Sequence, residues 1–283
     1  MLGAKVVRYF SRLKEYEVFG TFRGELPFNH QSIHWRKLDL IDKDGLWTLL
    51  EEVQPEIVIH CAANTNVDNC ELLVGESSYL HAEVIFEFKK CKSILLFVYI
   101  STDSIFDGQH GDYTEEDVPL PLNTYALTKL RGEDLVKENF IDHMIIRTNI
   151  FGYHERGNGV SITEWALDKF GSGEKIIGFK NVFFNPIYTG QLVEVIYKLI
   201  GAKFIGVINI GSSEAISKCF FLQTLASEFS FSSSLVECGT INQGILKAQR
   251  PLNTTLNISK MASLIGVLSL RDGLELLHND LLN

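Results

Sequence analysis

Short apolar runs alternate with amphipathic stretches along almost the whole chain. Runs of strand length lie at 17–23, 38–40, 55–61, 94–100, 143–150 and 206–211. Stretches with apolar residues at helical spacing lie between and around them, at 2–13, 45–53, 71–90, 124–136, 160–170, 190–200 and 217–229. A turn that caps the next helix is predicted at 185–189. Strands that alternate with helices are typical of an α/β fold whose parallel sheet is covered on both faces, so the pattern predicts a doubly wound parallel sheet.

The strand predicted at 94–100 is followed directly by small polar residues. Ser101, Thr102 and Asp103 come where this apolar run ends. Open α/β sheets bind their ligands beyond the carboxyl ends of the strands. The sequence therefore predicts that these three side chains lie at a ligand site.

A helix begins shortly after this segment and carries a second candidate pair. Asn123 is a suitable N-cap, and Tyr125 and Lys129 are four residues apart, hence one turn apart on one face. A nearby ammonium group favours the phenolate and is expected to lower the tyrosine pKa from about 10. With a hydroxyl from Thr102 to hold a carbonyl, the set suits general acid–base chemistry. Taken alone, the spacing also fits an exposed tyrosine beside a solvated lysine.

Two longer motifs surround these residues. Tyr-Ile-Ser-Thr-Asp-x-Ile-Phe-Asp-Gly spans 99–108, and Pro-Leu-Asn-Thr-Tyr-x3-Lys spans 121–129. Together they resemble the extended short-chain dehydrogenase/reductase family, in its dTDP-4-dehydrorhamnose reductase branch. The resemblance covers nearly the whole chain. It implies a Rossmann-like dinucleotide-binding region at 1–150 and a smaller C-terminal substrate region at 151–283, with some segments returning to the sheet.

The resemblance also implies an activity. The expected reaction is NADP-dependent reduction of a 4-keto nucleotide sugar in dTDP-rhamnose biosynthesis. Thr102 would bind the ketone and Tyr125 would protonate the alkoxide. Lys129 would bind the nicotinamide ribose, and Asp103 would orient the loop or a sugar hydroxyl. The expected substrate-binding residues are Thr102, Asn149 and Arg250.

The cofactor site expected from the resemblance involves several elements. Gly3 matches the third glycine of the Gly-rich turn, and the preceding strand and first two glycines are expected to be absent. Arg23 ends the strand at 17–23, where an arginine accommodates a 2′-phosphate, which favours NADP and leaves NAD open. The expected cofactor-binding residues are Gly3, Arg23, Asp39, Leu40, Ala62, Ala63, Tyr125, Lys129 and Ile150. A solvated Arg23, a turn aspartate at Asp39 and a surface Arg-Pro turn at Arg250 remain alternatives.

Two other functions fit the same fold. The family branch includes the methionine adenosyltransferase regulatory β-subunit, so a non-catalytic NADP-binding regulatory subunit is one alternative. That alternative is favoured by the expected truncated start, by His81 where relatives carry asparagine, and by Ser104 where they carry tyrosine. His81 itself is expected to be a hydrogen-bonded core residue. The third alternative is a structural remnant that binds neither cofactor nor partner.

Composition narrows the classes of partner. The net charge is −9, and no block of lysine or arginine stands out, which argues against binding to nucleic acid or an anionic membrane. The apolar run at 94–100 is far too short for a membrane span. His30 and His34 have no third ligand nearby in sequence, so no metal site is expected. A homodimer is an open alternative.

The chain has five cysteines and no Cys-x2-Cys pair. They stand at 61, 70, 91, 219 and 238. This odd number without a secretory signal predicts reduced, mostly buried thiols and a cytoplasmic chain.

Overall fold

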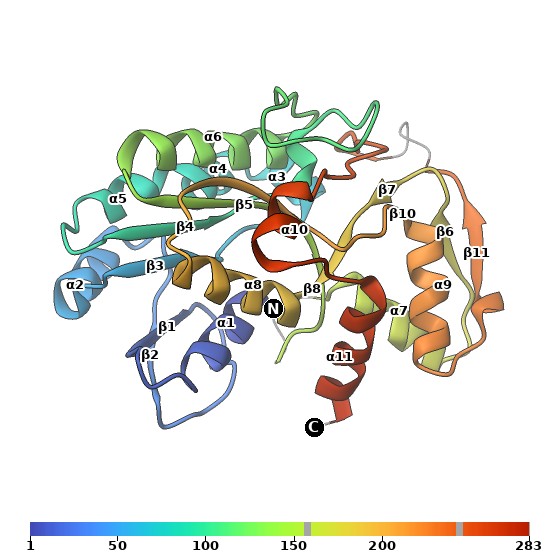
Figure 1. Ribbon diagram of the computed structural model, residues 1–283, viewed down its shortest axis with the longest axis horizontal. Helices are drawn as coiled ribbons and strands as arrows, with labels where there is room; N and C mark the ends of the chain where they lie inside the picture. The colour runs from blue at the N-terminus through green and yellow to red at the C-terminus, as the bar shows by residue number, and fades with distance from the viewer. Residues whose placement is uncertain (156–159, 242–245, 283) are drawn as a thin grey trace.

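The computed structural model describes residues 1–155, 160–241 and 246–282, and its centre is a parallel sheet of five strands (Figure 1). The strands are β3 (Ile57–His60), β4 (Leu96–Ile100), β5 (His143–Phe151), β8 (Pro186–Tyr188) and β9 (Gly206–Ile210). The longest, β5, pairs with β4 on one side. On its other side it pairs with β9 along its first half and with β8 along its second half.

Apolar side chains cover both faces of this sheet because successive strand residues point to opposite faces. Val98 of β4 and Met144 of β5 join one core cluster, with α1 (Leu2–Phe10), α8 (Thr189–Gly201) and α10 (Ser259–Ile265). Phe97, Tyr99 and Ile145 join another, with α2 (Lys43–Val53), α5 (Ile85–Lys89) and α6 (Thr124–Asn139). Figure 1 shows α1 and α8 on one side of the sheet and α5 and α6 on the other. The doubly wound parallel sheet is confirmed.

A separate two-stranded parallel sheet lies beside α1. It consists of β1 (Val18–Phe22), predicted from sequence, and β2 (Ile33–Lys37), which was not. The predicted strand end at 38–40 instead follows β2 and leads into α2. Asp42 caps α2 as expected, because its carboxylate accepts from the Gly45 amide at 3.0 Å.

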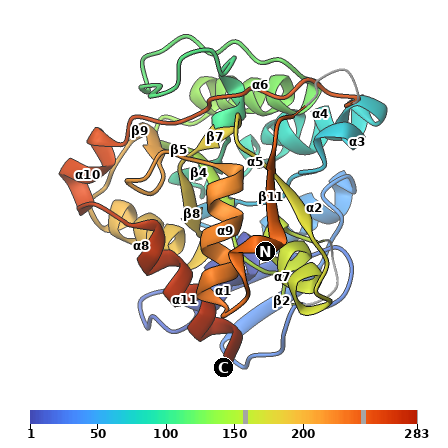
Figure 2. The same ribbon diagram turned by 90° about the vertical axis from the view of Figure 1, so that its right-hand side faces the viewer.

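The remaining elements pack as an outer layer at one end of the central sheet (Figure 2). Two short sheets, β6 (Ile176–Phe179) with β11 (Val236–Gly239) and β7 (Phe183–Phe184) with β10 (Ile216–Ser217), lie there. They share a third core cluster with α7 (Ile162–Gly171), α9 (Lys218–Glu228) and α11 (Leu270–Leu282). The boundary near residue 150 stays a prediction, since β8 and β9 lie beyond it in sequence but within the central sheet.

The single helix predicted at 71–90 is wrong. The segment is broken into α3 (Val67–Leu72), α4 (Val74–Ser78), a π-helical turn at Tyr79–Glu83 and α5. Leu73 leaves the helical region with φ −114° and ψ 53°. Apolar residues at helical spacing do not reveal such breaks, because each piece keeps nearly the same face toward the core.

The turn predicted at 185–189 is also wrong in part, because Pro186–Tyr188 form β8 and only Thr189 begins a helix. Proline is tolerated here as the first residue of the strand. The prediction that all cysteines are reduced is wrong as well. Cys219 of α9 and Cys238 of β11 form a disulfide, while the other three are free thiols, Cys61, Cys70 and Cys91. The two paired residues are 19 positions apart, and their proximity arises only from the packing of α9 on β11.

Candidate functional site

The loop after β4 is held by its own polar side chains. Thr102 caps a 3₁₀ turn at Asp103–Ile105, since its hydroxyl accepts from the Ser104 amide at 3.1 Å. The same hydroxyl donates to the Asp103 carboxylate at 3.2 Å. Thr102 is therefore positioned at the end of β4, with its proton directed to Asp103.

Asp103 is buried and connects three parts of the chain. Its carboxylate accepts hydrogen bonds from Thr102 and Ser104, from the Asn149 amide at 2.8 Å, and from the Thr254 hydroxyl. Asn149 lies in β5, and Thr254 comes from the C-terminal segment that carries Arg250, although the sequence did not point to Thr254 itself. Asp103 therefore links the loop after β4 to β5 and to the C-terminal segment, and its predicted role toward a sugar hydroxyl stays a prediction.

The start of α6 is tied to its neighbours on both sides. The Asn123 side chain accepts from the Ala126 amide at 2.9 Å, as expected for an N-cap, and donates to the carbonyl of Gln249 at 2.8 Å. The Glu71 carboxylate accepts from the amide and hydroxyl of Thr124 at 2.8 and 2.7 Å. These contacts fix the turn that carries Tyr125.

Tyr125 lines the large cleft described below, and its ring centre lies 5.7 Å from that of His81 with the two ring planes perpendicular. The expected lowering of its pKa is not found. Burial raises the pKa of Tyr125 to about 12, and the interaction with the Thr102 hydroxyl opposes this only partly. In the unliganded chain the phenol is therefore protonated near neutral pH and can act as a proton donor.

Lys129 is buried beside Tyr125, one helical turn further along α6. Its ammonium group donates to the carbonyl of Ile100 at 2.6 Å and lies 4.0 Å from the ring centre of Tyr99. Burial lowers the pKa of Lys129 to about 7, and the carboxylate of Glu133 opposes this. The lysine therefore reaches the end of β4, next to Thr102, and titrates near neutrality.

A buried ion pair joins α6 to β5 near Tyr125 and Lys129. Glu133 of α6 binds Arg147 of β5, with oxygen–nitrogen distances of 2.8 and 3.1 Å, and accepts from the Ser101 hydroxyl at 2.6 Å. Arg147 also donates to the carbonyl of Glu115 at 3.1 Å. The sequence analysis missed this cluster, because Glu133 and Arg147 are 14 residues apart and form no local motif.

His81 is a hydrogen-bonded core residue, as expected. Its Nε2 accepts a hydrogen bond from the backbone amide of Asn64 at 2.9 Å. Its Nδ1 therefore carries the proton and donates to the hydroxyl oxygen of Thr128 at 2.8 Å. Burial lowers the pKa of His81 to about 3, which keeps the ring neutral. His81 thus ties the loop after β3 to α6.

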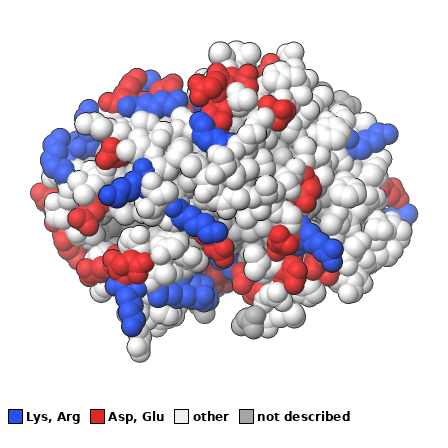
Figure 3. All heavy atoms as spheres, in the orientation of Figure 1, with Lys and Arg blue, Asp and Glu red and all other residues white. Residues whose placement is uncertain are grey.

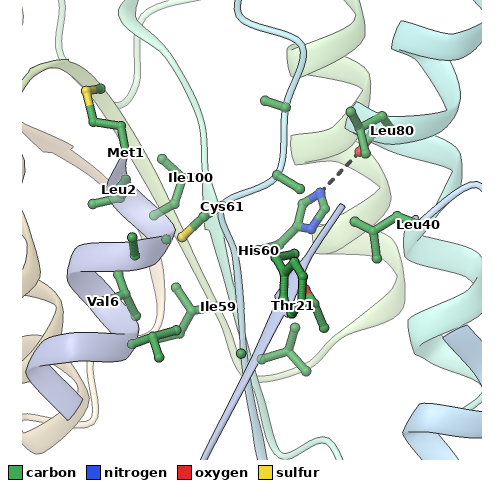
Figure 4. Close-up of a pocket in the computed structure, with 18 of the residues that line it drawn as sticks. Met1, Leu2, Val6, Thr21, Leu40, Ile59, His60, Cys61, Leu80 and Ile100 are labelled. Atoms are coloured by element: carbon green, nitrogen blue, oxygen red, sulfur yellow. Dashed lines mark hydrogen bonds between the residues drawn. The ribbon is translucent and has the colours of Figure 1, made fainter. Parts of the chain in front are cut away.

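One large cleft of about 1660 Å³ runs between the central sheet, α1 and the β1–β2 pair. Figure 4 shows part of it, where Cys61 points toward α1 while the preceding His60 points away, to the carbonyl of Leu80. Nearly every predicted site residue lines it: Gly3, Arg23, Asp39, Leu40, Ala62, Ala63, Thr102, Asp103, Tyr125, Lys129, Asn149 and Ile150.

Some of these side chains already have partners. The Arg23 side chain is 68 % exposed and lies 3.7 Å from the Glu76 carboxylate. Asp39 is exposed and accepts from the Ile41 amide at 3.2 Å, which is the geometry of a turn aspartate. Their cofactor roles stay predictions.

Arg250 is the predicted site residue that is not among those lining the cleft. Its guanidinium donates to the Asp68 carboxylate at 3.0 Å and to the carbonyl of Ala248 at 2.9 Å. Its contact with substrate phosphates stays a prediction.

Residues 1–155, 160–241 and 246–282 contain no cluster of histidine, cysteine and acidic residues able to hold a metal ion. No helix among them is long and apolar enough to cross a bilayer. On the face shown in Figure 3, basic and acidic side chains are interspersed.

The fold and the cleft define an α/β protein with a tyrosine–lysine pair at the carboxyl end of a parallel sheet. The family model described as "RmlD substrate binding domain" matches residues 1–281, so the chain belongs to this family. This match and the structures below confirm the resemblance to the dTDP-4-dehydrorhamnose reductase branch.

Two curated relatives are similar to the chain over most of its length. A probable low-salt glycan biosynthesis reductase (Agl14) from Haloferax volcanii is 27% identical, over 94% of this chain and 89% of that protein. Methionine adenosyltransferase 2 subunit beta from Rattus norvegicus is also 27% identical, over 93% of this chain and 79% of that protein.

Two solved structures share the fold. A hypothetical dTDP-4-dehydrorhamnose reductase from Sulfolobus tokodaii has a TM-score of 0.81 and 28% identity, covering 96% of this chain and 95% of that one. The dTDP-4-dehydrorhamnose reductase of Bacillus anthracis, in complex with NADP, has a TM-score of 0.79 and 24% identity. The match covers 88% of this chain and 90% of that one.

Proposed function

We propose that this chain is an NADP-dependent reductase of a 4-keto nucleotide sugar. The proposal rests on one observation: Thr102, Tyr125 and Lys129 line the same cleft at the carboxyl end of β4. Reductases of this family and the NADP complex of a structural neighbour support it.

The residues present fit a dinucleotide. The cleft exceeds the roughly 300–1,000 Å³ of typical small-molecule sites, so it has room for a cofactor and a substrate together. Gly3, in the first turn of α1, and the small Ala62 and Ala63 after β3 leave the backbone accessible along its wall. Free amides in the first turn of a helix suit a pyrophosphate.

The chemistry of the chain's own residues follows from their positions. NADPH, when bound, supplies the hydride. The Thr102 hydroxyl turns from Asp103 to donate to the substrate carbonyl, which orients that oxygen toward Tyr125. Tyr125, protonated at neutral pH, gives its proton to the oxygen that becomes an alkoxide. The charged form of Lys129 stabilises the phenolate left behind.

The direct test is consumption of NADPH, followed by absorbance, with dTDP-4-keto-rhamnose and with its UDP counterpart. Turnover with at least one of them is expected. NADPH binding without turnover on either would contradict the assignment as a reductase.

A second function is favoured by one comparison, the similarity to the methionine adenosyltransferase regulatory subunit over 93% of the chain. In this alternative the chain binds NADP and a partner enzyme without catalysis. Co-migration with a methionine adenosyltransferase in gel filtration, together with NADPH binding and no turnover, would support the alternative over the reductase.

A further inference from the structure

Lys218 is a cleft residue that the proposed mechanism does not use. It is the first residue of α9, directly after the N-cap Ser217, and its backbone amide donates to the carbonyl of Val182 at 2.8 Å. The preceding strand, β10, pairs with β7. The backbone at Lys218 is therefore fixed against β7 before its side chain makes any contact.

The side chain extends over an aromatic ring. The Lys218 ammonium lies 3.3 Å from the ring centre of Phe184, which is buried and packs edge-on against Phe221 at 5.6 Å. An aromatic face attracts a cation but does not replace the oxygen acceptors that an ammonium group has in water. The three N–H donors make no hydrogen bond or ion pair with any residue in the described part of the chain.

The carboxylate that acts on Lys218, that of Asp103, already has other partners. Asp103 is close enough to act on the charge of Lys218, yet its two oxygens already accept four hydrogen bonds, and no ion pair joins the two residues. Burial lowers the pKa of Lys218 to about 8, which reflects an incompletely solvated charge. An anion arriving in the cleft would stabilise this charge.

The other lysine and arginine side chains of the cleft already have partners. Within the described ranges, three lysine and arginine residues line it. Lys129 donates to the Ile100 carbonyl and Arg23 lies against Glu76, whereas Lys218 has only the ring of Phe184. In a chain of net charge −9, an anionic substrate depends on local cations of this kind.

We propose that Lys218 is a substrate-binding residue whose ammonium group contacts a phosphate oxygen of a nucleoside diphosphate moiety at the Thr102–Asp103 end of the cleft. The inference rests on the proposed function, because it names the group by which that site holds its substrate. It differs from the predicted role of Arg250, which does not line the cleft. A phosphate is favoured over a neutral sugar hydroxyl because a poorly solvated cation gains most from an opposite charge.

The test is calorimetric titration of the full chain with dTDP and, separately, with uncharged thymidine. Lys218→Met is expected to weaken dTDP binding about tenfold or more, which is the loss of one charge-assisted contact, and Lys218→Arg to restore most of it. Thymidine and NADPH affinities are expected to be unchanged. Lys175→Met is the matched control, since Lys175 is an exposed lysine paired with Glu237 outside the cleft.

Several results would overturn the proposal. They are unchanged dTDP affinity in Lys218→Met, an equal loss for thymidine, or no dTDP binding by the unaltered chain. If Lys218→Met does not fold, as judged by its thermal transition, Lys218→Gln replaces it, because its amide keeps the length without the charge.

The outcome is separable from that of the reductase assay. If the chain turns over a keto sugar nucleotide but its dTDP affinity does not depend on Lys218, only the proposed role of Lys218 is contradicted. If dTDP binding depends on Lys218 but no NADPH is consumed, only the assignment as a reductase is contradicted.

Discussion

Tyr125 is the residue on which the proposed chemistry depends most directly. With its pKa raised to about 12, Tyr125 is protonated near neutral pH, so in the proposed reaction its hydroxyl is the proton source. Tyr125→Phe keeps the ring against His81 and removes only the hydroxyl. We expect turnover to fall about 100-fold or more, in the range of general acid catalysis, with the NADPH dissociation constant nearly unchanged. Steady-state rates and fluorescence titration measure the two quantities, and an unaltered rate would exclude the assigned role.

Lys129 gives the site a dependence on pH. With a pKa of about 7 in the unliganded chain, Lys129 is charged below pH 7 and mostly neutral at pH 8. A phosphate-bearing cofactor nearby favours the charged form and raises this pKa. NADPH binding at pH 8 is therefore expected to take up protons, and binding at pH 6 hardly any. Calorimetry in two buffers of different ionisation enthalpy measures the uptake, and the absence of uptake at pH 8 would contradict this coupling.

Arg23 is the residue on which the predicted preference for NADP over NAD rests. Its exposed guanidinium lines the cleft and lies 3.7 Å from the Glu76 carboxylate, so a bound 2′-phosphate would compete with Glu76 for it. Arg23→Ala is expected to weaken NADPH about tenfold and NADH much less, because only NADPH carries that phosphate. Titrations with both cofactors provide the comparison. An equal loss for both would leave no basis for preferring NADP.

At the scale of the elements, α6 packs closely against the π-helical turn and β4 at Gly132. A Cβ added at Gly132 would lie 2.1 Å from the Tyr99 hydroxyl and 2.3 Å from the His81 carbonyl. Gly132→Ala is therefore expected to destabilise the fold by about 1–3 kcal/mol, as overpacking does. Gly75→Ala is the control, because that helical position has nothing within 4 Å and alanine favours helices.

Urea unfolding measures the stability of both variants. The Gly75 variant is expected to match or slightly exceed the unaltered chain. Equal midpoints for the two variants would mean that α6 can move away from the turn at little cost.

The elements themselves were predictable to different degrees. The strands β4 and β5 and the helix after Asn123 follow from apolar period and capping, which are local signals. The breaks around Leu73 and the π-helical turn do not, because tertiary contacts of His81 and Tyr99 decide them. At the site, Thr102, Tyr125 and Lys129 were identified through motifs. Lys218, Thr254 and the Glu133–Arg147 pair were not, because only the folded chain brings them there.

At the scale of the whole molecule, the Cys219–Cys238 disulfide ties α9 to the edge strand β11. In the chain-entropy model, a disulfide that closes a loop of 19 residues adds about 3 kcal/mol to the free energy of unfolding. Reduction is therefore expected to lower the melting temperature by several degrees. Thiol titration of the unfolded oxidised chain should find three free cysteines, Cys61, Cys70 and Cys91, and five after reduction. Five thiols before reduction would contradict the disulfide.

The π-helical turn at Tyr79–Glu83 also sets the rotational phase of the segment that follows it. Each helical residue advances the side chains by about 100° around the axis, and a π-turn contains in effect one inserted residue. Ile85 and Phe88 reach the core only after that extra step. Deleting a single residue here would make the helix regular, and it would also rotate those two side chains away from the sheet. An apparent irregularity of the backbone is thus what allows one helical segment to serve both the candidate site and the core.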